Sequence, residues 1–257
     1  MHLDTALVGA VCGAVGGCLV PAMIRRLPEP APKPDPQPDA EPDFEPDPEP
    51  DAKPAAEPKE PYAEIASLPG LAWKSALVSA VCAAVVGAAV GRQWALVILV
   101  PLVPLSVALA VIDWRTRLLP TRLVLPATGV AILLGLVGWA VTGDADDLVR
   151  AAIALVVVRS SFWVLWWFHS AGMGFGDVRL SALLGFALGQ LGWGEVVVGL
   201  YSGFLVFALP GLLLAVARRD RALLKSAFPF GPFMLVGALI GIVVGSAVWS
   251  SLFPAWA

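Results

Sequence analysis

The sequence predicts an all-α, polytopic integral membrane protein with about eight transmembrane helices. Of its 257 residues, 58% are hydrophobic and 14% are charged, and the mean hydropathy is +0.79. Soluble domains carry about 25% charged residues, so this composition excludes an ordinary soluble protein. A helix needs about 20 mostly apolar residues to cross roughly 30 Å of hydrocarbon, and apolar runs near that length recur along the chain.

Eight apolar segments make up the predicted bundle. They lie at residues 5–24, 75–91, 95–112, 123–141, 148–170, 180–192, 195–217 and 230–253. The sixth is too short to span unaided, so we expect a broken or partly immersed helix that lines a cavity or is buried in protein. Close helix packing is the role expected for the glycines at 129, 135, 138, 185, 189, 199, 203, 237, 241 and 245.

Lysine and arginine set the predicted orientation, because they concentrate in cytoplasmic loops. With the amino terminus outside, fourteen of them fall in loops predicted inside, whereas only Arg92 and Arg150 fall in loops predicted outside. The same distribution disfavours the inverse topology. Asp113 and Asp177, each at the edge of an apolar segment, are then both on the cytoplasmic side.

The chain divides into a first transmembrane helix (1–27), an acidic Pro-rich disordered cytoplasmic linker (28–70) and a seven-helix membrane core (71–257). Residues 28–61 hold eleven acidic and three basic side chains among alternating prolines, which favours solvated polyproline II over a packed domain. We interpret the linker as a spacer, with an acidic bait for a basic partner as the alternative. The lipid bilayer is an expected partner and nucleic acid is not, because the basic residues are scattered over short loops.

The three cysteines, Cys12, Cys18 and Cys82, lie inside apolar runs, where small thiols usually pack. The chain has no Cys-x-x-Cys pair. We therefore expect no disulfide framework, and no zinc or other metal site.

Two acids carry the expected chemistry. The stretch from Gly174 to Arg179 places two glycines and Asp177 directly before an apolar run, and glycine permits sharp backbone bends. Asp113 ends another apolar run on the same predicted side. Two carboxylates that share one proton can hydrolyse a peptide without a metal or covalent nucleophile, since one activates water and the other protonates the carbonyl. We therefore take Asp113 and Asp177 as the candidate catalytic pair.

Each acid also has a structural interpretation. Asp113 could pair with Arg117 four residues on, and Asp177 could cap the helix that follows it. The stretch Pro229-Phe230-Gly231-Pro232-Phe233 could be a simple helix entrance. Its unpaired backbone groups could instead receive an extended peptide, which makes Phe230, Gly231 and Pro232 candidate substrate-binding residues.

Two further polar residues have open roles. Arg159 lies near the centre of segment 148–170, which predicts a structural ion pair, a shifted helix or a place in the substrate pocket. His169 is the only histidine besides His2, so it is expected either to pack near the inner interface or to tune the ionisation of the acid pair.

Three stretches resemble the signatures of the type IV prepilin peptidase family, which consists of membrane aspartic peptidases of the Gly-x-Gly-Asp class. They are Ile112-Asp113 through Pro120, Gly174 through Leu180, and Pro229 through Phe233. The first span is also similar to the family's opening helix at Gly13, Gly17 and Ile24 through Pro28. The resemblance covers nearly all of the chain outside the linker.

The resemblance implies an aspartic endopeptidase in a bacterial inner membrane. Its partners are implied to be type IV prepilins or pseudopilins, whose leader peptides are cleaved at the cytoplasmic face just before the hydrophobic stretch. By matching motif positions, Asp113 and Asp177 are the catalytic pair, and Gly174, Gly176 and Arg179 belong to the active-site loop. Residues 71–257 are then the peptidase core.

The chain departs from the family pattern at several positions. Many members have two Cys-x-x-Cys pairs after the first span and are associated with N-methylation by S-adenosylmethionine. The linker takes that place here, so zinc is not expected, and S-adenosylmethionine is expected only if methylation is retained. Pro21 stands where members often have Asn, Thr121 where they often have Asn or Asp, and Arg179 where Lys is common.

The alternative function is that of a non-catalytic membrane protein. It would be a transporter, or a component of pilus or secretion assembly, whose Asp residues bind cations or pair with arginines. A pump favours acids near the membrane midplane, whereas both acids here fall near predicted helix ends. The sequence leaves open the secretion system served and the oligomeric state.

Overall fold

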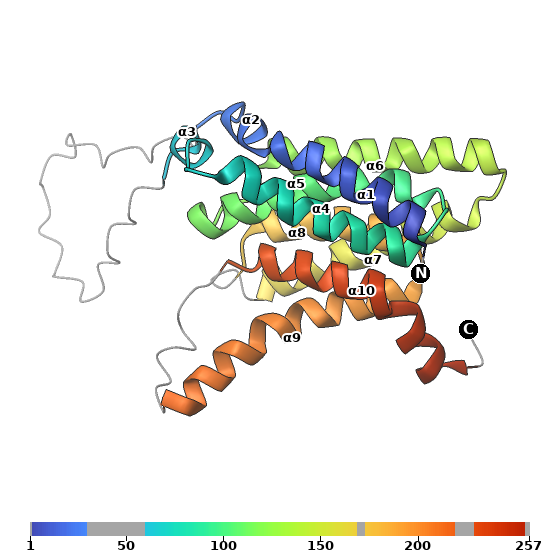
Figure 1. Cartoon of the computed structure of the whole chain (residues 1–257). Coiled ribbons are helices and arrows are strands. Elements are labelled where there is room, and N and C mark those ends of the chain that lie inside the picture. The colour runs from blue at the N-terminus through green and yellow to red at the C-terminus, as the bar shows by residue number, and fades with distance from the viewer. Residues whose placement is uncertain (1, 30–59, 169–172, 219–228, 255–257) are drawn as a thin grey trace, which may run out of the picture.

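The computed structural model describes residues 2–29, 60–168, 173–218 and 229–254, which form ten helices and no strand. The helices are α1 (Leu3–Cys18), α2 (Val20–Arg25), α3 (Tyr62–Ala66), α4 (Leu71–Val90), α5 (Ala95–Thr116), α6 (Thr121–Thr142), α7 (Asp146–Phe168), α8 (Phe175–Gly189), α9 (Trp193–Arg218) and α10 (Gly231–Leu252). Figure 1 shows the long helices side by side in one bundle. The predicted all-α class is confirmed for these residues.

The long helices follow the predicted apolar segments. By length and composition, α4, α5, α6, α7 and α10 can each cross a membrane, and α1 and residues Trp193–Leu209 of α9 are shorter apolar helices. Large apolar side chains such as Leu133 on α6 and Val156 on α7 are more than half exposed, as lipid-facing residues are. The chain is a multi-pass membrane protein.

Successive long helices alternate in direction, so their termini gather at two ends of the bundle. One end holds the C-terminal ends of α5 and α7 and the N-terminal ends of α4, α6, α8 and α10, together with α2 and α3. We call it the Asp end because it contains Asp113 and Asp177. The opposite end, which holds the α5 and α7 N-termini, is called the distal end.

Small residues bring three helix pairs into backbone contact: α1 with α4, α7 with α8, and α9 with α10. A Cβ added at Gly13 would collide with the carbonyl of Ser79 on α4, and one added at Gly189 would lie 2.6 Å from the Ala151 Cα on α7. The packing role predicted for the glycines is seen in these pairs. Gly129 is the exception, because an added Cβ would meet nothing within 4 Å.

Helix α3 occupies part of the range predicted as linker. Of residues 28–70, the structure describes 28, 29 and 60–70, so most of the predicted linker lies outside the described residues. The Glu29 carboxylate accepts hydrogen bonds from the backbone N–H groups of Tyr62 and Ala63, at 2.7 and 2.9 Å. Ile65 is fully buried in a cluster with residues of α2 and α5. The chain beyond the linker therefore returns against the Asp end.

Candidate active site

Asp113 lies in the last turn of α5 and is 4% exposed. The helix stops at Arg117, whose left-handed backbone (φ 53°) and N–H bond to the Asp113 carbonyl, at 2.8 Å, form the C-cap. The Asp113 carboxylate accepts a hydrogen bond at its Oδ2 from the backbone N–H of Gly231, at 3.0 Å. In the described part of the chain Arg117 makes no ion pair with Asp113, so the ion-pair interpretation is not supported.

Asp177 lies in the first turn of α8 and is 6% exposed. Its Oδ2 accepts a hydrogen bond from the Gly174 N–H at 3.1 Å, while its own N–H donates to the Gly174 carbonyl at 3.0 Å. The acid's half of a capping box is present, in which an acid three residues into the helix bonds back to the N-cap N–H, but Gly174 has no side chain to supply the other half. The capping interpretation therefore accounts for one carboxylate oxygen, and among the described residues no hydrogen bond engages the other.

The two acids come from different helices but share one environment. Each carboxylate is bonded by the N–H of a glycine from a signature stretch, Gly231 or Gly174. Gly176, which precedes Asp177, and Gly231, which bonds Asp113, both lie against Leu119, so the two acids are close to each other at this end of the bundle. No Lys or Arg in the described ranges forms an ion pair with either acid. The structure thus brings the predicted pair together and leaves its charge unneutralised by the described side chains.

Of the two loop glycines, Gly176 is needed for space, whereas a Cβ added at Gly174 would meet only ordinary contacts at 3.6 Å or more. Gly174 has extended backbone angles (φ −73°, ψ 147°), and neither Gly174 nor Gly176 has a positive φ, which differs from the expected sharp bend. At Gly176 an added Cβ would lie 2.8 Å from the Leu119 Cβ. The same leucine also lies beside Gly231, at 3.4 Å from an added Cβ. Leu119 therefore sets the spacing between the starts of α8 and α10.

Arg179 faces away from the acids. Its Nη1 donates to the Thr121 hydroxyl at 2.6 Å, and its guanidinium lies over the Phe175 ring at 4.8 Å. Both partners are anchored: Thr121 begins α6, and Phe175 packs edge-on against Trp166 of α7. Arg179 thus joins the starts of α6 and α8 and does not neutralise Asp177.

The three candidate substrate-binding residues differ in position. Phe230 is buried among aromatic rings that include Phe162 and Phe204, which favours a role in fixing the start of α10. Gly231 bonds Asp113, and a Cβ there would lie 2.5 Å from the Asp113 Oδ2. Pro232 is partly exposed and lines two cavities.

Residues 99–246, more than half of the chain, match the type IV leader peptidase family. The chain belongs to this family. The match runs from α5 into α10, so it includes both acids and the three signature stretches and leaves out α1 to α4. The acid pair therefore lies within the part of the chain that defines a type IV leader peptidase.

Curated relatives of this chain carry the name prepilin leader peptidase/N-methyltransferase. The Pseudomonas putida protein is 32% identical over 160 residues, which are 60% of this chain and 52% of the relative. The Aeromonas hydrophila protein is 30% identical over 67% of this chain and 58% of its own length, and the Escherichia coli K12 protein is 34% identical over 56% and 60%. The chain thus spans about half to three fifths of the relatives' length. No solved structure matches it.

The described residues contain no group of three or more His, Cys, Asp or Glu side chains that could hold a metal ion. Cys12, Cys18 and Cys82 are free thiols on α1 and α4. The expectations about zinc and S-adenosylmethionine remain predictions, and no step below passes through either.

The described residues place neither Arg159 nor His169, the two residues with open roles, in the site. Arg159 is exposed on α7 and forms no ion pair in the described ranges. His169 lies outside the described residues. Neither enters the proposal that follows.

Sequence reasoning missed two contacts that shape this candidate site. Leu119 was part of a signature stretch but had no predicted role, and Gly231 was assigned to substrate rather than to Asp113. Leu119 packs tightly on two glycines near helix starts. Such glycines often mark a close approach of another residue, so they were the sequence signal that could have indicated this contact. The bond from Gly231 to Asp113 joins residues 118 positions apart, and no local pattern reveals such a contact.

Proposed function

We propose that this protein is an aspartic endopeptidase of the bacterial inner membrane that removes the leader peptides of type IV prepilins or pseudopilins at the cytoplasmic face. One observation carries the proposal: two buried acids from different helices lie at the same end of the bundle, beside glycines that both pack on Leu119, without a described cationic partner. Acids that serve only structure are normally paired when buried, because an isolated buried carboxylate is costly.

The proposed chemistry needs one proton shared between Asp113 and Asp177. The ionised carboxylate takes a proton from water as the water oxygen attacks the carbonyl carbon of the scissile peptide, and the protonated acid donates its proton to the carbonyl oxygen. The tetrahedral diol then collapses. The C–N bond breaks, the departing nitrogen receives a proton and a carboxylic acid remains, so the net change is the addition of one water.

The local bonds support this use of the pair. The Gly231 and Gly174 N–H groups each occupy one oxygen of an acid, which fixes the orientation of both carboxylates. Arg179 and Arg115, the nearest basic residues in sequence, instead contact Thr121 and Glu60. Mutual repulsion between two close carboxylates favours the singly protonated form that the reaction requires.

The cytoplasmic side is proposed from the distribution of basic residues. The inside loops hold fourteen Lys and Arg side chains against two outside, and the Asp end is the inside end in that topology. The non-catalytic alternative has weaker support, because both acids lie at helix ends rather than at the midplane and neither pairs with a described arginine. Retention of methyltransferase activity stays open.

Processing of a tagged prepilin in cells tests the proposal. Co-expression with wild type should convert the precursor to the mature form, and Asp113→Asn and Asp177→Asn should each abolish conversion because Asn cannot exchange the proton. Asp147→Asn at the distal end is the matched control and should process normally, since Asp147 is exposed and paired with Arg150. Undiminished processing by either Asp113→Asn or Asp177→Asn would sink the proposed pair.

A further inference from the structure

An apolar groove runs along the bundle toward the Asp end. Two cavities, of about 230 and 460 Å³, lie between α4, α5 and α10. Residues of α8 also line the first cavity. They share four lining residues, Val78, Val107, Ala110 and Pro232, so they form one continuous groove. We call it the α4–α10 groove.

Residues that neighbour Asp113 line the end of the groove, although neither acid lines it. Ala110 lies one helical turn before Asp113 on α5, and Trp114 and Arg115 follow Asp113 at the groove's end. Pro232 on the other wall follows Gly231, whose N–H bonds the Asp113 carboxylate. A peptide chain that leaves the acid pair therefore meets the end of this groove first.

The lining has the shape and polarity of a helix-binding site. On α4 the lining residues recur every three or four positions from Leu71 to Val86, so one face of the helix forms a wall about 22 Å long. Charged lining residues, Lys74 and Arg115, occur only near the Asp end. Polar backbone can enter an apolar environment only with its hydrogen bonds satisfied, which favours a helical occupant over an extended strand.

The groove opens sideways toward lipid. Val78 on α4 and Val236 on α10 line it and are 48% and 46% exposed, so they form a rim between the two helices. A helix that already lies in the membrane can enter through this opening without crossing water.

We propose that the α4–α10 groove binds the hydrophobic helix that follows the scissile bond of the precursor. This inference rests on the proposed peptidase function and adds where the retained part of the substrate lies. The groove then fixes the register of cleavage, because an apolar helix seated against α4 and α5 leaves its first, unwound residues between Asp113 and Asp177. Recognition follows the helix-in-groove mode, with anchors every three or four residues.

The structure predicts the depth at which each substrate residue lies. Val86 and Leu99 belong to one buried cluster, so in this antiparallel pair Cys82 lies level with Val103. Val103 is ten residues before Asp113, or about 15 Å along α5. A bound helix that begins at the acid pair should reach Cys82 roughly ten residues beyond the scissile bond.

Disulfide cross-linking with the native cysteines tests the proposal. A prepilin from the same bacterium carries single cysteines at successive positions 5 to 14 after its cleavage site, and the enzyme keeps only Cys82 (Cys12→Ala, Cys18→Ala). The control enzyme keeps only Cys18, which is exposed on α1 outside the groove. Oxidation with copper phenanthroline should cross-link Cys82 to substrate positions near ten, recurring with helical spacing, and Cys18 to none.

Cleavage measured in the same membranes separates the two ideas. If wild type cleaves but no cross-link forms to Cys82, or to a cysteine placed at Val78 or Leu235, the groove is not the binding site while the peptidase proposal survives. Cross-links to Cys18 as strong as those to Cys82 also overturn the groove. If wild type does not cleave the precursor at all, the peptidase proposal fails and this inference fails with it.

Discussion

Two acids at each end of the bundle differ in their exposure and in their bonding partners. At the distal end Asp147 is mostly exposed and pairs with Arg150, and Asp4 pairs with Arg92. At the Asp end Asp113 and Asp177 are buried and are bonded only by backbone N–H groups among the described residues. Asp147 and Asp4 are thus neutralised where they can meet water, whereas Asp113 and Asp177 have no described cationic partner although they are buried.

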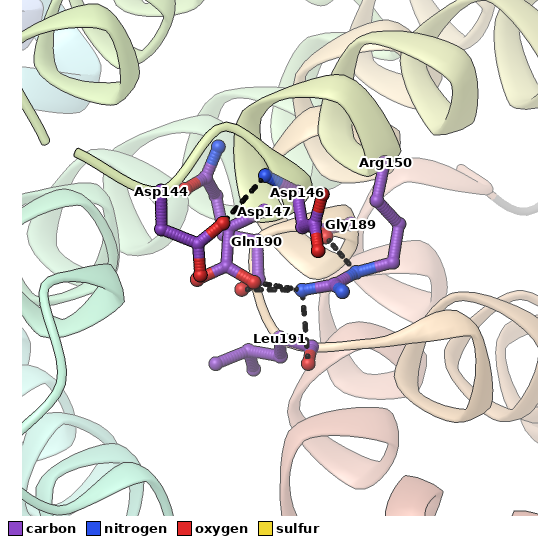
Figure 2. A network of polar contacts seen from close by, with 7 residues as sticks. All are labelled: Asp144, Asp146, Asp147, Arg150, Gly189, Gln190 and Leu191. Atoms are coloured by element: carbon purple, nitrogen blue, oxygen red, sulfur yellow. Dashed lines mark hydrogen bonds and ion pairs between the residues drawn. The ribbon is translucent and has the colours of Figure 1, made fainter. Parts of the chain in front are cut away.

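Arg150 shows what a structural charge looks like in this protein. Figure 2 shows its guanidinium reaching across from α7 to the C-terminal end of α8, where it donates to the carbonyls of Gly189 (2.7 Å), Gln190 (3.2 Å) and Leu191 (3.4 Å) and to Asp147 (2.5 Å). A cation there satisfies carbonyls that the helix leaves unpaired. Helix α8 is thus fixed at one end by a cation and carries an unpaired acid at the other.

Among substitutions that leave both acids in place, the largest effect should come from adding one methyl group at the Asp end. In Gly231→Ala the new Cβ would lie 2.5 Å from the Asp113 Oδ2, a side-chain atom that can move, so the fold should persist while the carboxylate shifts by about 1 Å. Misplacement of that size lowers rates by roughly 100-fold. The initial rate of prepilin cleavage by purified enzyme and the thermal unfolding temperature measure the two effects.

Two other glycines separate this effect from general damage. Gly129→Ala adds a Cβ that meets nothing within 4 Å, so its cleavage rate and stability should match wild type or improve slightly. Gly237→Ala would drive a Cβ into the backbone of α9, so it should lower the unfolding temperature first. A Gly231→Ala enzyme with full activity would mean that the Asp113 position is not critical.

At the distal end a single substitution of Arg150 should lower the stability of the fold without changing the cleavage rate. Arg150→Ala removes donors from three carbonyls, which should cost about 2 kcal/mol, or roughly 4–8 °C in the unfolding temperature. Arg150→Lys should recover only part, because an ammonium lacks the planar fork of donors. Asp147→Asn should change stability by less than about 1 kcal/mol, since that pair is exposed.

Cleavage at a temperature well below unfolding distinguishes the two ends. Arg150→Ala should then cleave at nearly the wild-type rate. Loss of cleavage in Arg150→Ala with an unchanged unfolding temperature would contradict the assignment of Arg150 to structure and the contrast between the ends.

Sequence reasoning located the helices because their apolar length is a local property. Segment 95–112 became α5 at Ala95–Thr116, whereas segment 180–192 became α8 at Phe175–Gly189, five residues earlier. The charges of Asp177 and Arg179 made the hydropathy pattern begin too late. In the structure Asp177 bonds the Gly174 backbone and Arg179 bonds Thr121, so the helix can begin before both charges. A hydropathy pattern records the cost of a charge in lipid, and the compensating contacts lie elsewhere in the chain.

The sequence indicated the two candidate acids but not the residues that hold them in place. Asp113 and Asp177 stand out because charges at the edges of apolar runs are rare and the signature stretches surround them. The bond from Gly231 to Asp113 and the carbonyl contacts of Arg150 join distant segments. Arg150 was predicted only as one of two basic residues in the outside loops. Long-range packing decides such contacts, so one sequence without its fold cannot reveal them.

The smallest expected effect lies in the link between α6 and α8. Thr121→Val keeps the shape of the side chain but removes the hydroxyl that accepts from Arg179 at 2.6 Å. One such bond is worth about 1 kcal/mol, so the unfolding temperature should fall by roughly 2–4 °C, and looser positioning of Asp177 should slow cleavage about fivefold. Thr121→Asn supplies a new acceptor and should restore most of the rate. Thr128→Val is the matched control, because that hydroxyl bonds only the Val124 carbonyl of its own helix. If both valine variants slow cleavage equally, α6 acts through its general stability and the Arg179 contact has no special part in placing the acid.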